Sequence, residues 1–244
     1  MNDVEIEKEN AAIAKQYKKL LRVSYLTLSA KDKKLIRSAF DVAVDAHKDQ
    51  RRKSGEAYIF HPIAVAKIIA QEIGMDATSI AAALLHDVVE DNPNYTLDDI
   101  QQLFGETVAR IVDGLTKISS LKKDMDVSTQ AENFRKMLLT LHDDVRVIII
   151  KIADRLHNMK TMEAMRPDKQ VKIASETLYI YAPLAHRIGL YNIKTELEDL
   201  GLKYTEPEVY NDIFTKIKES KEEQDRSEER RVGKECRSRW SPDH

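Results

Sequence analysis

The sequence predicts an all-α protein, and three observations support that fold class. Glycine and proline are scarce, with 7 and 6 residues in a chain of 244. The strict apolar–polar alternation of half-buried strands is rare, whereas apolar residues recur at helical spacing between polar turns. A chain of this length can bury a core without disulfides or structural metals.

Composition narrows the class of protein further. Hydrophobic residues make up 42% and charged residues 33% of the chain, and the formal net charge is -2. These values are typical of a soluble globular protein and argue against a general nucleic-acid or membrane surface. The single cysteine, Cys236, excludes a disulfide framework and a cysteine-ligated zinc site. Because no segment resembles a secretory signal or a membrane span, we expect a cytoplasmic protein.

Four elements are expected in the first third of the chain. A weakly amphipathic helix covers residues 5–21, and a capping box at Ser29 begins a second helix that ends near residue 47. A polar, basic loop follows at residues 49–58. The proline of a His-Pro pair is favourable in a first helical turn, so we expect a third helix over residues 61–74.

The centre of the chain predicts one continuous helix over residues 76–91. The segment Ile80–Leu85 is apolar on every side, which indicates a buried helix. Four polar residues then arrive within two turns: His86, Asp87, Glu90 and Asp91. On a continuous helix, His86 would lie over Glu90 and Asp87 over Asp91. Such groups are not left buried without a partner; they pair with other charges or bind a metal.

The sequence from residue 96 onward predicts further helices. Thr96 begins a short helix that Gly105 ends, and residues 106–113 form the next one. We expect residues 114–130 to form a loop, because they show no periodicity. The segment 145–154 is rich in β-branched residues, but its helical pattern continues through residue 159, so we predict a buried helix. The remaining helices are expected over residues 169–186, 193–202 and 205–225.

Four residues could join into a metal site. A mixed set of imidazole and carboxylate groups suits Mn²⁺, Fe²⁺, Zn²⁺ or Mg²⁺, and its members here are His61, His86, Asp87 and Asp154. Taken singly, each has a simpler explanation: a histidine in the core, or an aspartate paired with arginine or lysine. His157 lies near Asp154 in sequence and could support the site, but we expect it to pack in the core.

The basic loop also has two interpretations. Its sequence Arg51-Arg-Lys-Ser-Gly55 is either a solvated surface loop or a binding loop for the phosphates and base of a nucleotide. Arginine offers planar stacking and paired donors, whereas lysine offers a point charge. Beside a metal centre, both interpretations stay open.

Together, these segments resemble the hydrolase domain of long RelA/SpoT homologues. The resemblance covers roughly residues 10–225, and its motifs occur in the family's order: Gln50–Pro62, Leu84–Asp91, Phe104–Lys117, Asp154–Met159 and Tyr181–Gly189. Two positions depart from the family's usual residues, with Ala57 in place of proline and Asn92 in place of threonine.

The resemblance implies an all-helical HD-superfamily domain that uses Mn²⁺ to remove the 3′-pyrophosphate from guanosine tetra- and pentaphosphate. It implies that His61, His86, Asp87 and Asp154 hold the metal. Glu90 and Asp91 would position or deprotonate the attacking water. The guanine nucleotide would be contacted by Arg52, Lys53 and Ser54, in a pocket also lined by Asn158 and Thr161.

The same resemblance suggests a domain organisation. We expect the hydrolase domain in residues 1–200, a helical junction in 201–226, and a disordered, non-native-looking tail in 227–244. In long homologues, a synthetase domain and regulatory domains follow the hydrolase domain, so this chain would stop before them. Two other functions stay open: an HD phosphohydrolase for another nucleotide, and a regulatory module that binds guanine nucleotides without hydrolysing them.

Overall fold

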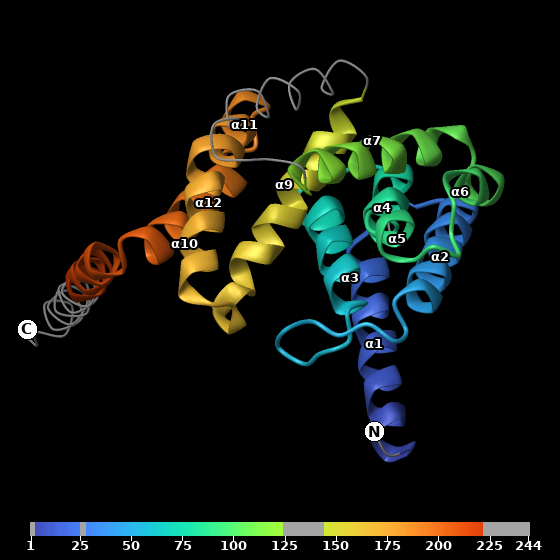
Figure 1. Ribbon diagram of the computed structural model, residues 1–244, viewed down its shortest axis with the longest axis horizontal. Helices are drawn as coiled ribbons and strands as arrows, with labels where there is room; N and C mark the ends of the chain where they lie inside the picture. The colour runs from blue at the N-terminus through green and yellow to red at the C-terminus, as the bar shows by residue number, and fades with distance from the viewer. Residues whose placement is uncertain (1–2, 25–27, 124–143, 222–244) are drawn as a thin grey trace, which may run out of the picture.

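A computed structural model describes residues 3–24, 28–123 and 144–221, and helices joined by short connections make up these ranges (Figure 1). Within them no β-strand occurs, and one isolated bridge pairs Arg51 with Ala57. The prediction of an all-α fold is therefore confirmed. No helix in the described ranges has both the length and the apolar character needed to cross a membrane.

The first two helices pack through aromatic and small apolar residues. Helix α1 spans Asp3–Ser24 and α2 spans Ala30–Ala46. The predicted capping box at Ser29 is present: its hydroxyl accepts from the Asp32 N–H at 3.2 Å, and the Asp32 carboxylate accepts from the Ser29 N–H at 2.9 Å. Tyr17 of α1 stacks on Phe40 of α2 with ring centroids 4.2 Å apart.

The predicted third helix is present with a change of winding. Helix α3 spans Phe60–Lys67 and continues as a π-helical segment, η1, over Ile68–Ile73. Gly74 ends it in the left-handed conformation at φ 77°, which glycine adopts without a steric cost. The π-helical winding continues into this cap, because the Gly74 N–H donates to the Ile69 carbonyl, five residues earlier.

The prediction of one continuous helix over residues 76–91 is wrong. Helix α4 spans Ala77–Leu84, a turn follows, and α5 is a single turn over Val88–Asp91. The His86 ring binds the Ala83 carbonyl oxygen at 2.8 Å, and the Val88 N–H donates to the Leu85 carbonyl. In a continuous helix, successive side chains point about 100° apart, so the turn is what allows His86 and Asp87 to face the same point.

The predicted loop over residues 114–130 is also partly wrong. Helix α6 spans Leu97–Phe104 with the predicted Thr96 cap, but α7 spans Glu106–Lys123 and includes the first ten residues of that loop. Gly114 lies inside this helix, and a Cβ there would lie 2.8 Å from Cγ2 of Val147 on helix α9 (Val145–Lys160). Residues 124–130 lie outside the described ranges.

Helix α9, over Val145–Lys160, lies between the N-terminal and C-terminal groups of helices (Figure 1). It contacts α3, α4, α7 and the later helix α12 (Tyr191–Thr205), so its β-branched residues are buried on several sides. This confirms the prediction of a buried helix. Asp144 caps its first turn by accepting from the Arg146 N–H at 3.0 Å.

The C-terminal group contains the remaining elements: η3 (Met162–Ala164), α10 (Pro167–Glu176), the π-helical η4 (Thr177–Tyr181), α11 (Ala182–Arg187) and α12 (Tyr191–Thr205). Residues 207–221 form a further helix with a largely exposed surface. The domain boundaries at residues 200 and 226 stay predictions, and the tail 227–244 lies outside the described residues.

Candidate metal centre and adjoining pocket

Four side chains from three separate elements converge on one point. His61 stands in the first turn of α3, His86 and Asp87 occupy the turn between α4 and α5, and Asp154 lies in α9. His61 Nε2 lies 3.1 Å from Asp154 Oδ1 and 3.9 Å from Asp87 Oδ2. His86 Nε2 lies 2.9 Å from Asp87 Oδ2 and 3.9 Å from Asp154 Oδ1.

These separations suit a metal centre. Ligand atoms about 2.0–2.2 Å from one divalent ion lie roughly 3–4 Å from each other. The four distances, from 2.9 to 3.9 Å, lie in or within 0.1 Å of that interval, and two nitrogens with two oxygens form a donor set without sulfur. His61, His86 and Asp154 also form a cluster whose ligand atoms all lie within 4.8 Å of one another.

The tautomer of His86 supports the same conclusion. Its Nδ1 faces the Ala83 carbonyl, which can only accept, so Nδ1 carries the proton of the neutral ring. A histidine binds a metal as the neutral ring, and in that form the lone pair on Nε2 points at the Asp87 carboxylate; this buried nitrogen has no hydrogen-bond partner among the described residues. A cation between the two lone pairs would satisfy both groups.

The electrostatics favour positive charge at this point. Burial alone would raise the pKa of Asp154, but the hydrogen bond from His61 and the Lys151 charge hold it well below its usual value. Burial opposes ionisation of Asp87 as well, and His86 nevertheless keeps the pKa of that carboxyl low. The pKa of His86 is raised, because the two carboxylates outweigh the effect of burial.

Two residues outside the predicted ligand set support the ligands. The Tyr58 hydroxyl donates to Asp87 Oδ2 at 2.7 Å, and His157 Nδ1 lies 2.8 Å from His61 Nδ1. If His61 binds a metal through Nε2, its Nδ1–H donates to His157, which fixes the orientation of the ring. Burial and the charges of His61 and Arg52 lower the pKa of His157 to about 3, so its ring is neutral and can accept.

The expectation that His157 only packs in the core is therefore wrong. The available signal was its spacing, because it lies one helical turn after Asp154 and shares that face of α9. Tyr58 offered a comparable signal, since it lies three residues before His61. Neither spacing by itself indicates which ligand atom the side chain contacts.

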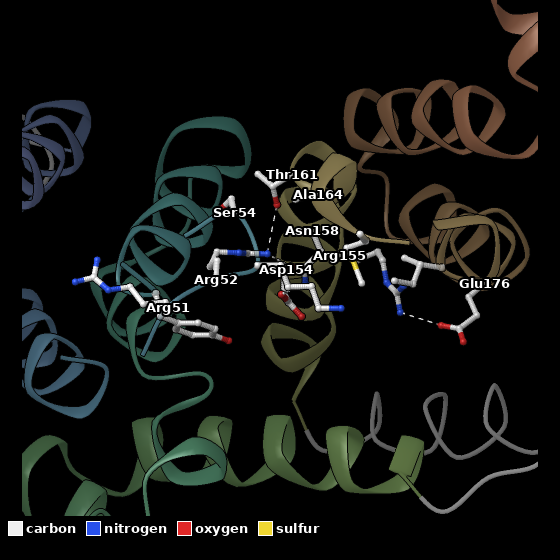
Figure 2. Close-up of a pocket in the computed structure, with 13 residues that line it drawn as sticks. Arg51, Arg52, Ser54, Asp154, Arg155, Asn158, Thr161, Ala164 and Glu176 are labelled. Carbon is white, nitrogen blue, oxygen red and sulfur yellow. Dashed lines mark hydrogen bonds and ion pairs between the residues drawn. The ribbon is translucent and has the colours of Figure 1, made fainter. Parts of the chain in front are cut away.

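A pocket of about 460 Å³ adjoins the metal centre at Asp154 (Figure 2). All five predicted substrate residues line it: Arg52, Lys53, Ser54, Asn158 and Thr161. Tyr58 also lines it, so the pocket touches both a ligand of the candidate metal centre and a residue that supports one.

Arg52 connects the basic loop to the metal centre. Its Nη2 donates to Asn158 Oδ1 at 2.8 Å and to Thr161 Oγ1 at 3.3 Å, and Asn158 Nδ2 donates to Asp154 Oδ1 at 2.7 Å. The loop is held by backbone bonds from Arg52 N to Glu56 O and from Gly55 N to Arg52 O, both 2.9 Å long. Arg52 is half-buried by these contacts, whereas residues 51 and 53–56 of the loop are exposed.

The two predicted catalytic carboxylates stand apart from the pocket lining. Glu90 is half-buried and Asp91 is exposed, and both lie on the single turn of α5 after Asp87. Asp91 is near enough to Tyr58 for its charge to help raise that pKa, after the larger effects of burial and Asp87. The two carboxylates thus lie within about one turn after Asp87, on α5.

Comparison with known proteins assigns the family. The model of the HD domain family matches residues 39–191, which is more than half of the chain, and the chain belongs to this family. HD domains are a class of helical proteins, and the fold described above agrees with that assignment.

The individual relatives are more specific. The chain is 52% identical over 185 residues to the bifunctional (p)ppGpp synthase/hydrolase SpoT of Escherichia coli K12, covering 76% of this chain and 26% of that protein. It is 49% identical over 186 residues to the guanosine-3′,5′-bis(diphosphate) 3′-pyrophosphohydrolase of Aquifex aeolicus, with the same coverage. It is also 44% identical over 198 residues to a GTP pyrophosphokinase of Myxococcus xanthus, covering 80% of this chain and 26% of that protein.

A solved structure is similar as well. It is described as a metazoan ortholog of SpoT that hydrolyzes ppGpp and plays a role in starvation responses. The TM-score is 0.54 at 29% identity, and the match covers 71% of this chain and 94% of that chain. By contrast, the chain spans only about a quarter of the length of the curated relatives it matches.

Proposed function

We propose that this chain is a metal-dependent hydrolase that removes the 3′-pyrophosphate from guanosine tetra- and pentaphosphate, releasing GDP or GTP and pyrophosphate. One observation carries the proposal: the His61–His86–Asp87–Asp154 cluster adjoins a pocket whose basic loop is connected to it through Arg52 and Asn158. The names of the bacterial relatives and of the metazoan structure support the same substrate.

The four ligand residues would hold one divalent ion, and we propose Mn²⁺. Imidazole nitrogens and carboxylate oxygens suit this ion, as they suit Fe²⁺ and Zn²⁺. When bound, such an ion polarises a phosphoryl oxygen and lowers the pKa of water in the site. Tyr58 and His157 would keep Asp87 and His61 in their binding orientations.

The reaction transfers the 3′-pyrophosphoryl group to water. The oxygen of water attacks the phosphorus attached to O3′, the bond between that phosphorus and O3′ breaks, and O3′ takes a proton. We assign the acceptance of the proton from water to Glu90 or Asp91, which lie within about one turn after Asp87. Arg52 and Lys53 would bind the phosphates and base, with Ser54, Asn158 and Thr161 orienting the nucleotide.

The test is hydrolysis of guanosine tetraphosphate by purified protein with Mn²⁺, with products separated by chromatography. GDP and pyrophosphate should appear, and a chelator or the Asp87→Asn substitution should prevent their formation. The double variant Glu90→Gln, Asp91→Asn should retain the metal but lose turnover. Absence of turnover by the wild-type protein with Mn²⁺ would contradict the proposal.

A regulatory module is the second candidate, because one relative is named a GTP pyrophosphokinase. That function predicts nucleotide binding without turnover in the same assay. We further propose that synthetase and regulatory domains are the partners of this domain, with residues 201–226 as the junction towards them.

A further inference from the structure

Gln50 contacts three parts of the molecule that surround the candidate site. Its backbone N–H donates to the His47 carbonyl at 3.1 Å, and its carbonyl accepts from the Tyr58 N–H at 3.0 Å across the basic loop. Its side-chain Nε2 donates to the backbone carbonyl of Asp91 at 3.2 Å, 41 residues further along the chain. One residue therefore joins the end of α2, the basic loop and the helical turn α5.

Two partners fix the orientation of the Gln50 amide. A backbone carbonyl only accepts, so the amide nitrogen must face Asp91 and the amide oxygen must face the other partner. That partner is Nδ1 of His47, which lies 2.8 Å from Gln50 Oε1. Because an amide oxygen also only accepts, Nδ1 of His47 carries the proton of this hydrogen bond.

His47 gives this amide a rigid support. Its side chain is buried, and its ring lies 4.8 Å, between centroids, from the ring of Tyr58. Burial lowers the pKa of His47, so the ring is neutral at neutral pH. The amide that holds the Asp91 carbonyl is thus itself held by a core residue.

Helix α5 depends on contacts of this kind because it is a single turn. An isolated turn fixes several backbone angles for very few hydrogen bonds, so it is unstable by itself. Val88 is the one buried residue of α5. A second contact with α2 lies just after the turn, where Asn92 Nδ2 donates to the Ala46 carbonyl at 3.0 Å. Side-chain hydrogen bonds from the end of α2 therefore hold this turn in place.

We infer that Gln50 is a positioning residue, which fixes α5 relative to the basic loop and so places the carboxylates of Glu90 and Asp91 for the reaction. Gln50 is not among the residues that line the pocket and is not a proposed metal ligand, so it acts through α5. A small displacement of a catalytic group lowers the rate even where binding is intact. The inference rests on the proposed function and on its assignment of proton acceptance to α5.

The first experiment measures kcat and KM for guanosine tetraphosphate with the whole chain and saturating Mn²⁺. Gln50→Met keeps the length of the side chain and adds no charge, but it removes both side-chain hydrogen bonds. We expect kcat to fall about 10-fold, as for the loss of one well-placed hydrogen bond to a partner left without a substitute. KM should stay within about 2-fold, because the backbone bonds of Gln50 that shape the loop remain.

The matched control is Tyr95→Phe. The Tyr95 hydroxyl donates to Asp45 Oδ2 at 2.8 Å, so it also joins α2 to the chain after α5, but it ends on a carboxylate away from the site. Its kcat should equal that of the wild type. An unchanged kcat in Gln50→Met, or an equal fall in the control, would overturn the inference.

His47 allows a test by conservative rescue. Asparagine places its amide N–H near the position of Nδ1, whereas glutamine places it near that of Nε2. Both variants lose the ring that packs on Tyr58, so their comparison isolates the hydrogen bond to Gln50. His47→Asn should retain a kcat about 3-fold or more above that of His47→Gln, and the reverse order would contradict the role of this bond.

Amide hydrogen exchange at Asp91, followed by NMR, reports the position of α5 without turnover. The Asp91 N–H donates to the Asp87 carbonyl at 2.9 Å. Relative to the amides of α9, it should exchange about 10-fold faster in Gln50→Met and at the wild-type rate in Tyr95→Phe. Faster exchange in the variant of a wild type without turnover would keep the contact between Gln50 and α5 and reject the hydrolase. Turnover by the wild type with unchanged exchange and kcat in Gln50→Met would reject the role of Gln50 and keep the hydrolase.

Discussion

Metal binding should stabilise this fold, and one histidine should control the effect. The proposed ligands come from α3, from the turn before α5 and from α9, so one ion would connect three segments that are far apart in sequence. The unfolded chain does not hold these groups together, and an ion that binds only the folded state stabilises it.

The expected magnitude follows from mass action. At a Mn²⁺ concentration 100 times the dissociation constant, the free energy of unfolding rises by about 2.7 kcal/mol. For a domain of this size, each kcal/mol shifts the midpoint of thermal unfolding by roughly 2–4 °C, so the shift should be roughly 5–11 °C.

The assay is thermal denaturation after treatment with a chelator, followed by titration of Mn²⁺. In the wild type the midpoint should rise with the logarithm of the metal concentration, whereas His86→Gln should abolish most of the rise. His186→Gln is the control, because this exposed histidine of α11 lies against Tyr191 and outside the ligand cluster. The reasoning fails if the wild type shows no shift, or if His86→Gln shifts as much as the control.

Three further predictions concern single contacts. Tyr58→Phe should weaken Mn²⁺ binding about 10- to 100-fold in calorimetric titration, because it removes the hydrogen bond to a ligand carboxylate; unchanged affinity would exclude this support. Gly114→Ala should lower the free energy of unfolding in urea by about 1–3 kcal/mol, because its Cβ meets Val147; adding Val147→Ala should reduce that cost, and simple additivity would contradict the contact. The Arg146 hydrogen bond lowers the pKa of Asp144, so this stabilisation is present above about pH 4 and lost as pH falls through the lowered pKa. The difference in urea midpoint between the wild type and Asp144→Asn should therefore shrink below about pH 4, and a constant difference would refute the assignment.

Local chemistry made several elements predictable. The caps at Ser29 and Thr96 depend on side chains that reach backbone groups three residues away, so short sequence patterns specify them. The buried helix α9 was predictable because its apolar period continues beyond the β-branched segment. For the candidate site, the resemblance to a family identified the residues that the structure brings together.

Contacts between distant segments explain the failures. The segment after residue 113 shows no periodicity in sequence, but α7 continues through Gly114, where the close approach of Val147 leaves no room for a side chain. The sequence between Leu84 and Val88 contains no proline or glycine that would indicate the break in the helix. It depends on the pairing of the turn's side chains with His61 and Asp154, which come from other helices.

The sequence by itself determined the helical class, the main caps and the identity of the polar residues that interrupt apolar segments. These properties depend on periodicity and on groups within one or two turns of each other. Only the tertiary structure decided that Tyr58 and His157 support the ligands, and that Glu176, which is paired with Arg155, lines the pocket. Each of these contacts joins different helices or loops, and their relative placement is set by how the whole core packs.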